Sequence, residues 1–142
     1  MIQTLNPTTI AAPFGPYSQG IIAPAAGRWL HIAGQVGVGP DGALAEGFEA
    51  QARTAWSNLV AVLVAAGMSA ADLVKVTTYL IDPADVPRLG PVRGHFLGDA
   101  RPASTLVVVR ALARPDWSIE VEATPFSTRP ETPSLRPRRY RP

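Results

Sequence analysis

Two carboxylates on one short segment are the residues best suited to chemistry in this sequence. The segment Ile119 to Ala123 alternates apolar and acidic residues, which predicts a strand with Glu120 and Glu122 on the same face. A carboxylate partly removed from water has a raised pKa and can act as a general acid or base. The alternative is that this face meets solvent, or that Glu120 forms an ion pair with one of three arginines, Arg28, Arg110 or Arg114.

Hydroxyl groups begin the run that precedes this acidic segment. Ser104 and Thr105 follow Pro102-Ala103, and the sequence from Thr105 to Val109 is otherwise apolar and β-branched. Such a run is typical of a strand that is covered on both faces. The two hydroxyls could donate hydrogen bonds to a ligand, although small polar residues are also common where strands begin.

Residues for metal or cofactor chemistry are scarce. The chain has no cysteine, and its two histidines, His31 and His95, have no acidic neighbours at ligand spacing. Gly37 and Gly39 precede a turn rather than a helix, so they do not form a phosphate-binding loop. We therefore expect neither a metal nor a cofactor.

Three motifs in this order resemble the Rid family (YjgF-like proteins, reactive intermediate deaminases, also called endoribonuclease L-PSP). Residues 15–20, GPYSQG, resemble the family's G-P-Y-x-Q-[GA] turn, and residues 32–36, IAGQV, resemble its [ST]-G-Q-[IV] strand end. The third motif begins at Pro102-Ala103 and closes on IEVEA, residues 119–123. Together the motifs span most of the chain.

The resemblance implies a fold, an assembly and a site. The fold is α+β and chorismate-mutase-like, a mixed sheet with two helices on one face, and the subunits form a homotrimer with pockets between them. Glu120 is then the residue that positions or activates water, and Tyr17 projects into the pocket. Gly34 lets a ligand approach the backbone closely.

Three positions depart from the family pattern. Ser104 stands where deaminating members carry the arginine that grips a substrate carboxylate, and Leu106 stands where they often have cysteine. Gly90 occupies a position that often carries asparagine. An arginine binds a carboxylate through two charge-assisted hydrogen bonds, whereas serine offers one neutral donor.

We therefore expect an enzyme of hydrolase, deaminase or isomerase type that acts on an imine, an enamine or a related intermediate, but not an efficient 2-imino acid deaminase. A protein that binds a metabolite without catalysis is the alternative. An RNA-binding or ribonuclease-type member is less favoured, and so is any nucleic-acid partner.

The elements that must position these residues follow from periodicity. We predict a strand over Arg28–Val36, paired in a hairpin with Ile21–Ala23, and a strand over Leu73–Ile81. A helix is predicted from Glu46 to Ala66, where Gly67 ends it. A second helix should begin at Asp82-Pro83 and reach Leu97, with a kink or break at Pro91.

Charge separates the two ends of the chain. Residues 129–142 hold five arginines and one glutamate, a net charge of +4, whereas residues 1–128 have a net charge of −2. We therefore expect a Rid-like domain over residues 1–127 and a Pro/Arg-rich extension over residues 128–142 that is disordered. No apolar run is long enough to span a bilayer, and a cytoplasmic protein is expected.

Overall fold

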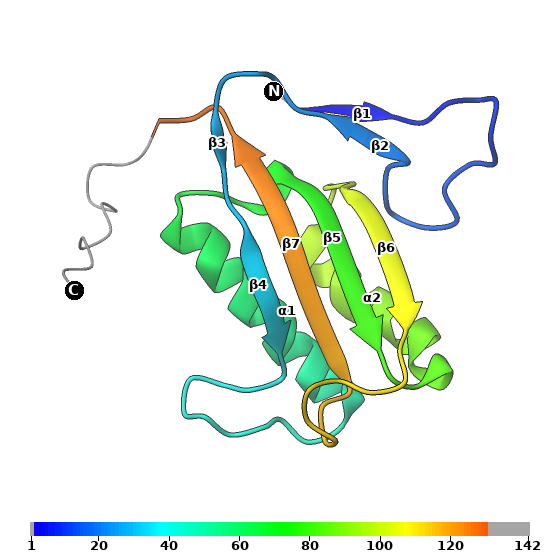
Figure 1. Ribbon diagram of the computed structural model, residues 1–142, viewed down its shortest axis with the longest axis vertical. Helices are drawn as coiled ribbons and strands as arrows, with labels where there is room; N and C mark the ends of the chain where they lie inside the picture. The colour runs from blue at the N-terminus through cyan, green and yellow to red at the C-terminus, as the bar shows by residue number, and fades with distance from the viewer. Residues whose placement is uncertain (1, 131–142) are drawn as a thin grey trace.

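The computed structural model describes residues 2–130, which form a main sheet, a small hairpin and two helices (Figure 1). The strands are β1 (Gln3–Leu5), β2 (Gly20–Ile22), β3 (Arg28–Trp29), β4 (Ile32–Val36), β5 (Leu73–Leu80), β6 (Ala103–Val108) and β7 (Ile119–Ser127). The helices are α1 (Phe48–Ala65) and α2 (Val86–Leu97), with short 3-10 turns at Ala70–Asp72 and Pro83–Asp85. The predicted mixed sheet with two helices on one face is confirmed.

The long strand β7 organises the main sheet. It pairs antiparallel with β5 on one side and with β3 and β4 on the other, and β5 pairs parallel with β6. Both helices lie behind this sheet in Figure 1, so its other face, here called the open face, is covered by no helix of the described chain. Side chains alternate between the two faces along each strand.

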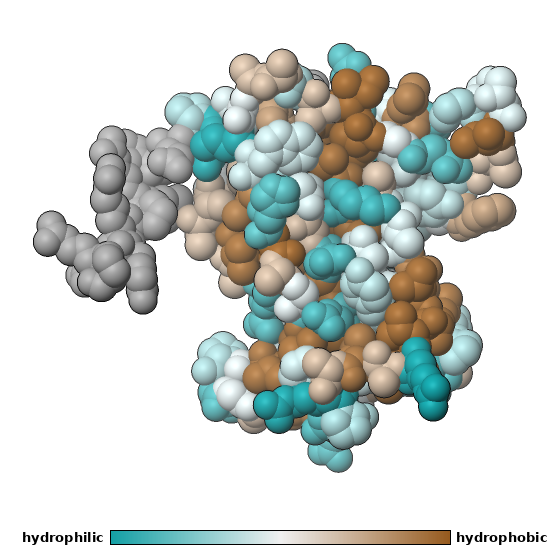
Figure 2. Space-filling model, viewed as in Figure 1, coloured by the Kyte–Doolittle hydropathy of each residue, from teal (hydrophilic) through white to brown (hydrophobic). Residues whose placement is uncertain are grey.

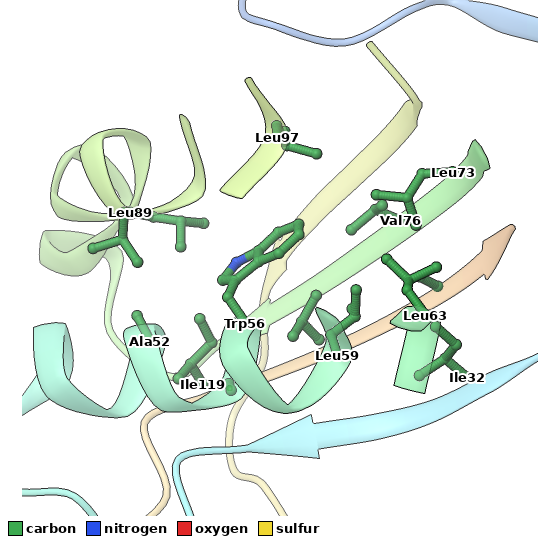
Figure 3. Packing of buried hydrophobic residues seen from close by; sticks show 14 of the residues in the cluster. Ile32, Ala52, Trp56, Leu59, Leu63, Leu73, Val76, Leu89, Leu97 and Ile119 are labelled. Atoms are coloured by element: carbon green, nitrogen blue, oxygen red, sulfur yellow. The ribbon is translucent and has the colours of Figure 1, made fainter. Parts of the chain in front are cut away.

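The core lies between α1, α2 and the covered face of the sheet. Trp56 of α1 is buried at its centre (Figure 3). Its ring stacks on that of Phe96 of α2, with ring centroids 6.1 Å apart. Leu59 and Leu63 continue the buried stripe of α1, as the helical spacing predicts. Val64, in contrast, is 63 % exposed, so the second half of α1 is covered on one side only within this chain.

The second helix continues through Pro91, so the predicted break is wrong. Pro91 is the sixth residue of α2, and the hydrogen bond that it cannot donate would have reached the carbonyl of Pro87 in the first turn. The residue before a proline is normally forced out of the helical region by a clash with its Cβ atom. Gly90 has no Cβ, which explains how Gly90-Pro91 is accommodated inside a helix. The predicted N-cap is confirmed, since Asp82 accepts a hydrogen bond from the Ala84 backbone N–H at 2.9 Å.

The N-terminal strands pair differently from the prediction. β2 pairs antiparallel with β1 rather than returning in a hairpin to β3, and this two-stranded sheet extends away from the main sheet in Figure 1. The strand predicted over Arg28–Val36 is divided into β3 and β4, both of which pair with β7. An irregular register between Ile32 and Gln35 accompanies this division.

The last strand of the main sheet, β7, ends at Ser127. Beyond it, Arg129 forms an ion pair with Asp72, and its carbonyl accepts a hydrogen bond from Arg28 at 3.1 Å. The first residues of the predicted extension therefore pack on the domain. Its remainder, residues 131–142, lies outside the described residues.

Candidate functional site

Glu120 lies on the open face of the sheet. In the register of β5 and β7, Tyr79 stands opposite Glu120, and Thr77 stands opposite Glu122. The flanking residues Ile119 and Val121 are buried in the core, so alternation turns both glutamates away from the helices. Among the described residues, Glu120 forms neither an ion pair nor a side-chain hydrogen bond, and the ion pair considered from the sequence is not formed within the chain.

The second carboxylate is already engaged. The Tyr79 hydroxyl donates a hydrogen bond of 2.7 Å to Oε1 of Glu122. This bond raises the pKa of Tyr79, because its neutral form is the donor, and burial and the negative charges of Glu122 and Glu120 act in the same direction. Of the two carboxylates on this face, Glu120 is therefore the one left available to a ligand or to water.

Gly34 is in close contact with Glu120. A Cβ atom built on Gly34 would lie 1.9 Å from Oε1 of Glu120 and 2.7 Å from its carboxyl carbon. A side chain at position 34 would therefore occupy the space that the carboxylate takes. The sequence predicted a close approach of a ligand at Gly34; in the described chain the group that approaches is the glutamate itself.

Two hollows flank these residues on the open face. One, of about 330 Å³, is lined by Glu120, Glu122, Tyr79 and the segment 109–113 that leaves β6. The other, of about 430 Å³, lies between β4, β5 and β7 and includes His31, Lys75 and Glu122. Figure 2 shows this face, with hydrophilic residues along its middle and hydrophobic ones to either side. Glu120 thus borders open volume beside a polar surface.

The residues expected on β6 divide between the two faces of the sheet. Ser104 stands in register with Val76, which is buried on the covered face, and Leu106 packs against the core. Thr105 is exposed on the open face, where its Oγ1 accepts a hydrogen bond of 2.5 Å from Nζ of Lys75. Ser104 and Leu106 therefore lie on the opposite side of the sheet from Glu120.

Tyr17 lies at the free edge of β6. Its neighbour Ser18 donates a backbone hydrogen bond of 3.0 Å to the carbonyl of Pro102 and bridges to Ala103 in parallel. The Tyr17 hydroxyl accepts a hydrogen bond of 3.1 Å from the backbone N–H of Phe14. The turn that carries Tyr17 thus extends the sheet at the point where β6 begins, near Ser104.

Gly90 and Arg101 complete the positions considered from the sequence. Gly90 lies on the exposed side of α2, where an added Cβ would meet nothing within 4 Å. The Arg101 guanidinium donates to the carbonyls of Gly98 and Ala100, both at 2.8 Å, so it is held at the end of α2. Arg101 is therefore engaged at the end of α2 and does not replace the arginine that deaminating family members carry at the position of Ser104.

Sequence reasoning missed Tyr79 as part of this site. Tyr79 alternates with buried residues along β5, which predicts only that it faces away from the core. Its placement beside Glu120 depends on the register between β5 and β7, and a one-residue shift would turn it to the other face.

The described residues contain no group of three His, Cys, Asp or Glu side chains that could hold a metal ion. The same part of the chain includes no helix that is both long and apolar enough to cross a bilayer.

Comparison with known proteins gives consistent matches. The model of the family described as endoribonuclease L-PSP matches residues 8–126. A RutC family protein of Pyrococcus horikoshii is 40 % identical over 116 residues, covering 80 % of this chain and 89 % of that protein. The 2-iminobutanoate/2-iminopropanoate deaminase of Salmonella typhimurium is 34 % identical over 127 residues, covering 87 % and 96 %.

A solved structure agrees with these sequence matches. The crystal structure of YyfB, a Rid family protein of unknown function from Yersinia pestis, superposes with a TM-score of 0.76 at 32 % identity, covering 87 % of this chain and 97 % of that one. The motifs, the fold and these similarities lead to one conclusion: the chain belongs to the Rid (YjgF) family, whose family model carries the description endoribonuclease L-PSP.

Proposed function

We propose that this protein hydrolyses small imines or enamines in a pocket between the subunits of a homotrimer, with Glu120 directing the water. The observation that carries the proposal is the state of Glu120, a half-buried carboxylate without a partner in the described chain, beside an open hollow. A carboxylate in such a position can accept a proton from water. The similarity to a 2-iminobutanoate/2-iminopropanoate deaminase supports the reaction class.

The proposed reaction needs one base that later acts as an acid. Glu120 takes a proton from water as the water oxygen bonds to the imine carbon, and the C=N double bond becomes a C–N single bond. With the imine protonated on nitrogen, this addition gives a neutral carbinolamine, and the protonated Glu120 returns its proton to that nitrogen. The C–N bond then breaks as the carbinolamine hydroxyl becomes a carbonyl and gives its proton back to Glu120. That proton passes to the departing ammonia, so the products are a carbonyl compound and ammonium. An enamine first gains a proton on carbon and becomes an imine.

The need for a second subunit follows from the two faces of the sheet. Glu120 and Gly34 lie on the open face, whereas Ser104 and Leu106 lie on the covered face and Tyr17 lies beyond the edge of β6. These groups cannot line one pocket within a single chain, but the open face of one copy and the β6 edge of another can meet. Val107 and Val108 of β6 are 38 % and 41 % exposed, and a neighbouring copy would remove this apolar surface from water.

Ser104 restricts the substrates that this site would favour. It contributes one neutral hydroxyl at the position where an arginine would bind a carboxylate with two charge-assisted hydrogen bonds. The β6 strand therefore gives no cationic grip on a 2-imino acid, and uncharged imines belong among the substrates to be screened.

Glu120→Gln tests the proposal, because the amide keeps the shape of the side chain but is not a base. We expect ammonia release from imines generated in solution to fall on the order of a hundredfold or more, with the oligomer and ligand affinity kept. Glu49→Gln, on the exposed first turn of α1, is the matched control. Unchanged turnover in Glu120→Gln would exclude Glu120 as the base. If the wild type itself shows no turnover of imines, the result would favour a protein that binds a metabolite without catalysis.

Light scattering at micromolar concentration tests the assembly. A trimer is expected, and a monomer would remove the basis of the shared pocket.

A further inference from the structure

Arg93, on α2, is a half-buried cation without a partner among the described residues. It follows the buried Val92, and its Nε atom is buried without a hydrogen-bond partner. Burial lowers the pKa of Arg93, as expected for a charge that has lost water and gained no counter-charge. Removing a charge from water is costly unless an opposite charge or hydrogen-bond acceptors replace the water.

Three other arginines, two of them on or beside α2, have partners within the described chain. Arg88, also on α2, forms an ion pair of 2.8 Å with Asp85, and Arg129 is paired with Asp72. Arg101 donates to the backbone carbonyls at the end of α2. Arg93 is therefore the half-buried guanidinium on this side of the molecule whose hydrogen-bonding capacity is still available to an anion.

An aromatic ring and open surface border Arg93. A point at the Cβ position of Gly15 lies 4.0 Å from Nη2 of Arg93 and 3.9 Å from Cδ1 of the Tyr17 ring. The guanidinium and the ring therefore border the same spot, which Gly15 leaves free of side-chain atoms. On α2 itself, a Cβ atom at Gly90 or at Gly94 would meet nothing within 4 Å, so the surface on both sides of Arg93 is open.

We propose that Arg93 and Tyr17 form the subsite that binds the carboxylate of a small-molecule ligand, at the β6 edge of the pocket described above. The proposal rests on the proposed function for the rest of that pocket. A guanidinium presents two parallel N–H groups that match the two oxygens of a carboxylate, and the Tyr17 ring can cover the apolar part of the same ligand. One guanidinium balances the charge of a monoanion but not that of a phosphate dianion. Arg101 does not add a second charge here, because it donates to backbone carbonyls at the end of α2.

This subsite would place carboxylate recognition on α2 rather than on β6, the strand that carries Ser104. The turn of residues 15–18 is tied to the start of β6 by the Ser18 to Pro102 hydrogen bond, so Arg93 and Ser104 flank the same turn. A ligand carboxylate would then be held from α2, and Ser104 would contribute at most a neutral hydrogen bond.

Binding of two stable ligands that share an ethyl ketone group tests this assignment by calorimetry. 2-Oxobutanoate carries a carboxylate where 2-butanone carries a methyl group, so the difference in their affinities measures recognition of the carboxylate. We expect the wild type to bind 2-oxobutanoate at least tenfold more tightly than 2-butanone, and more tightly than inorganic phosphate. Arg93→Gln should lower the affinity for 2-oxobutanoate by roughly ten- to a hundredfold and leave 2-butanone unchanged. Arg93→Lys should keep part of the preference, because it keeps the charge without the planar fork.

The matched control is Arg101→Gln, which removes an arginine bonded to backbone carbonyls and should leave both affinities unchanged. Equal binding of 2-oxobutanoate by Arg93→Gln and wild type would overturn the proposal. So would dissociation of the oligomer by Arg93→Gln, since the guanidinium would then pair with a carboxylate of a second copy. Equal binding of phosphate and 2-oxobutanoate would overturn the choice of a carboxylate.

Glu120→Gln makes failure of this inference distinguishable from failure of the proposed function. If Glu120→Gln keeps turnover while Arg93→Gln loses the preference for 2-oxobutanoate, the carboxylate subsite stands and the role of Glu120 falls. If Glu120→Gln loses turnover while Arg93→Gln keeps the preference for 2-oxobutanoate, the role of Glu120 stands and the carboxylate subsite falls.

Discussion

A methyl group at Gly34 should displace the carboxylate of Glu120 and leave the fold intact. The Cβ atom of Gly34→Ala would lie 1.9 Å from Oε1 of Glu120, whereas ordinary contact requires about 3.4 Å, so the carboxylate must move by about 1.5 Å. Cγ of Glu120 would also be too close, at 2.9 Å, so the side chain must rotate from Cγ outward. Because it is a flexible side chain on the open face, this movement costs little stability. A misplacement of about 1 Å in a catalytic group can cost on the order of a hundredfold in rate, so we expect a loss of that size in kcat.

The assay is ammonia release from an imine substrate, with the melting temperature of each variant measured in parallel. Gly20→Ala is the matched control, since its Cβ atom would meet its nearest neighbour, Leu5, at an ordinary distance of 3.8 Å. It should keep full activity.

A double-mutant cycle identifies the group through which Gly34 acts. If the methyl group acts only by moving the carboxylate, Gly34→Ala should lower the activity of the wild type and add no further loss to Glu120→Gln. Equal losses in both backgrounds would refute the reasoning, because Gly34 would then act on the ligand or the backbone. Full activity of Gly34→Ala alone would show that the position of the carboxylate does not limit the reaction.

Three further outcomes are expected. Ser104→Arg adds a cation on β6 to the one that Arg93 would supply from α2, and should raise kcat/KM for 2-iminobutanoate by roughly tenfold; an unchanged value would contradict the view that a cation on β6 improves recognition of the carboxylate. The hydrogen bond to Glu122 raises the pKa of Tyr79, so its contribution to stability should be complete below pH of about 10 and be lost as the pH rises through the higher folded value. Ultraviolet titration should give a lower pKa for Tyr79 in Glu122→Gln than in the wild type, and an unchanged pKa would contradict the hydrogen bond to Glu122 as its cause. A chain ending at residue 130 should melt like the full chain, whereas one ending at residue 127 loses the contacts of Arg129 and should melt up to a few degrees lower; equal melting of the two would show that these contacts add nothing.

The sequence determined the elements of this protein wherever periodicity or a terminal residue is a strong local signal. The apolar stripe of α1 and its end at Gly67, which has φ of +67°, follow from side-chain spacing and from the conformational freedom of glycine. The Asp82 cap and the strands β5, β6 and β7 were likewise predicted within one or two residues at most ends. The three motifs also indicate the family, because each one is a short run of residue types at fixed spacing along the chain.

Only the tertiary structure decided which residues meet. Local sequence does not encode strand register or pairing partners, so the pairing of β2 with β1, the Tyr79 to Glu122 bond and the contact between Gly34 and Glu120 could not be predicted. The continuity of α2 through Pro91 depended on the absence of a Cβ atom at Gly90, which spacing rules alone do not weigh.

The position of Arg93 illustrates the same limit. In the sequence it is one of several arginines on or near a helix, and only packing against the turn of residues 15–18 separates it from the paired ones. Sequence therefore specified the groups that could do chemistry, because their types and spacing are local properties. Their partners, their burial and the face on which each one lies arise from contacts between segments far apart in the chain, and these exist only once the sheet and its two helices are assembled.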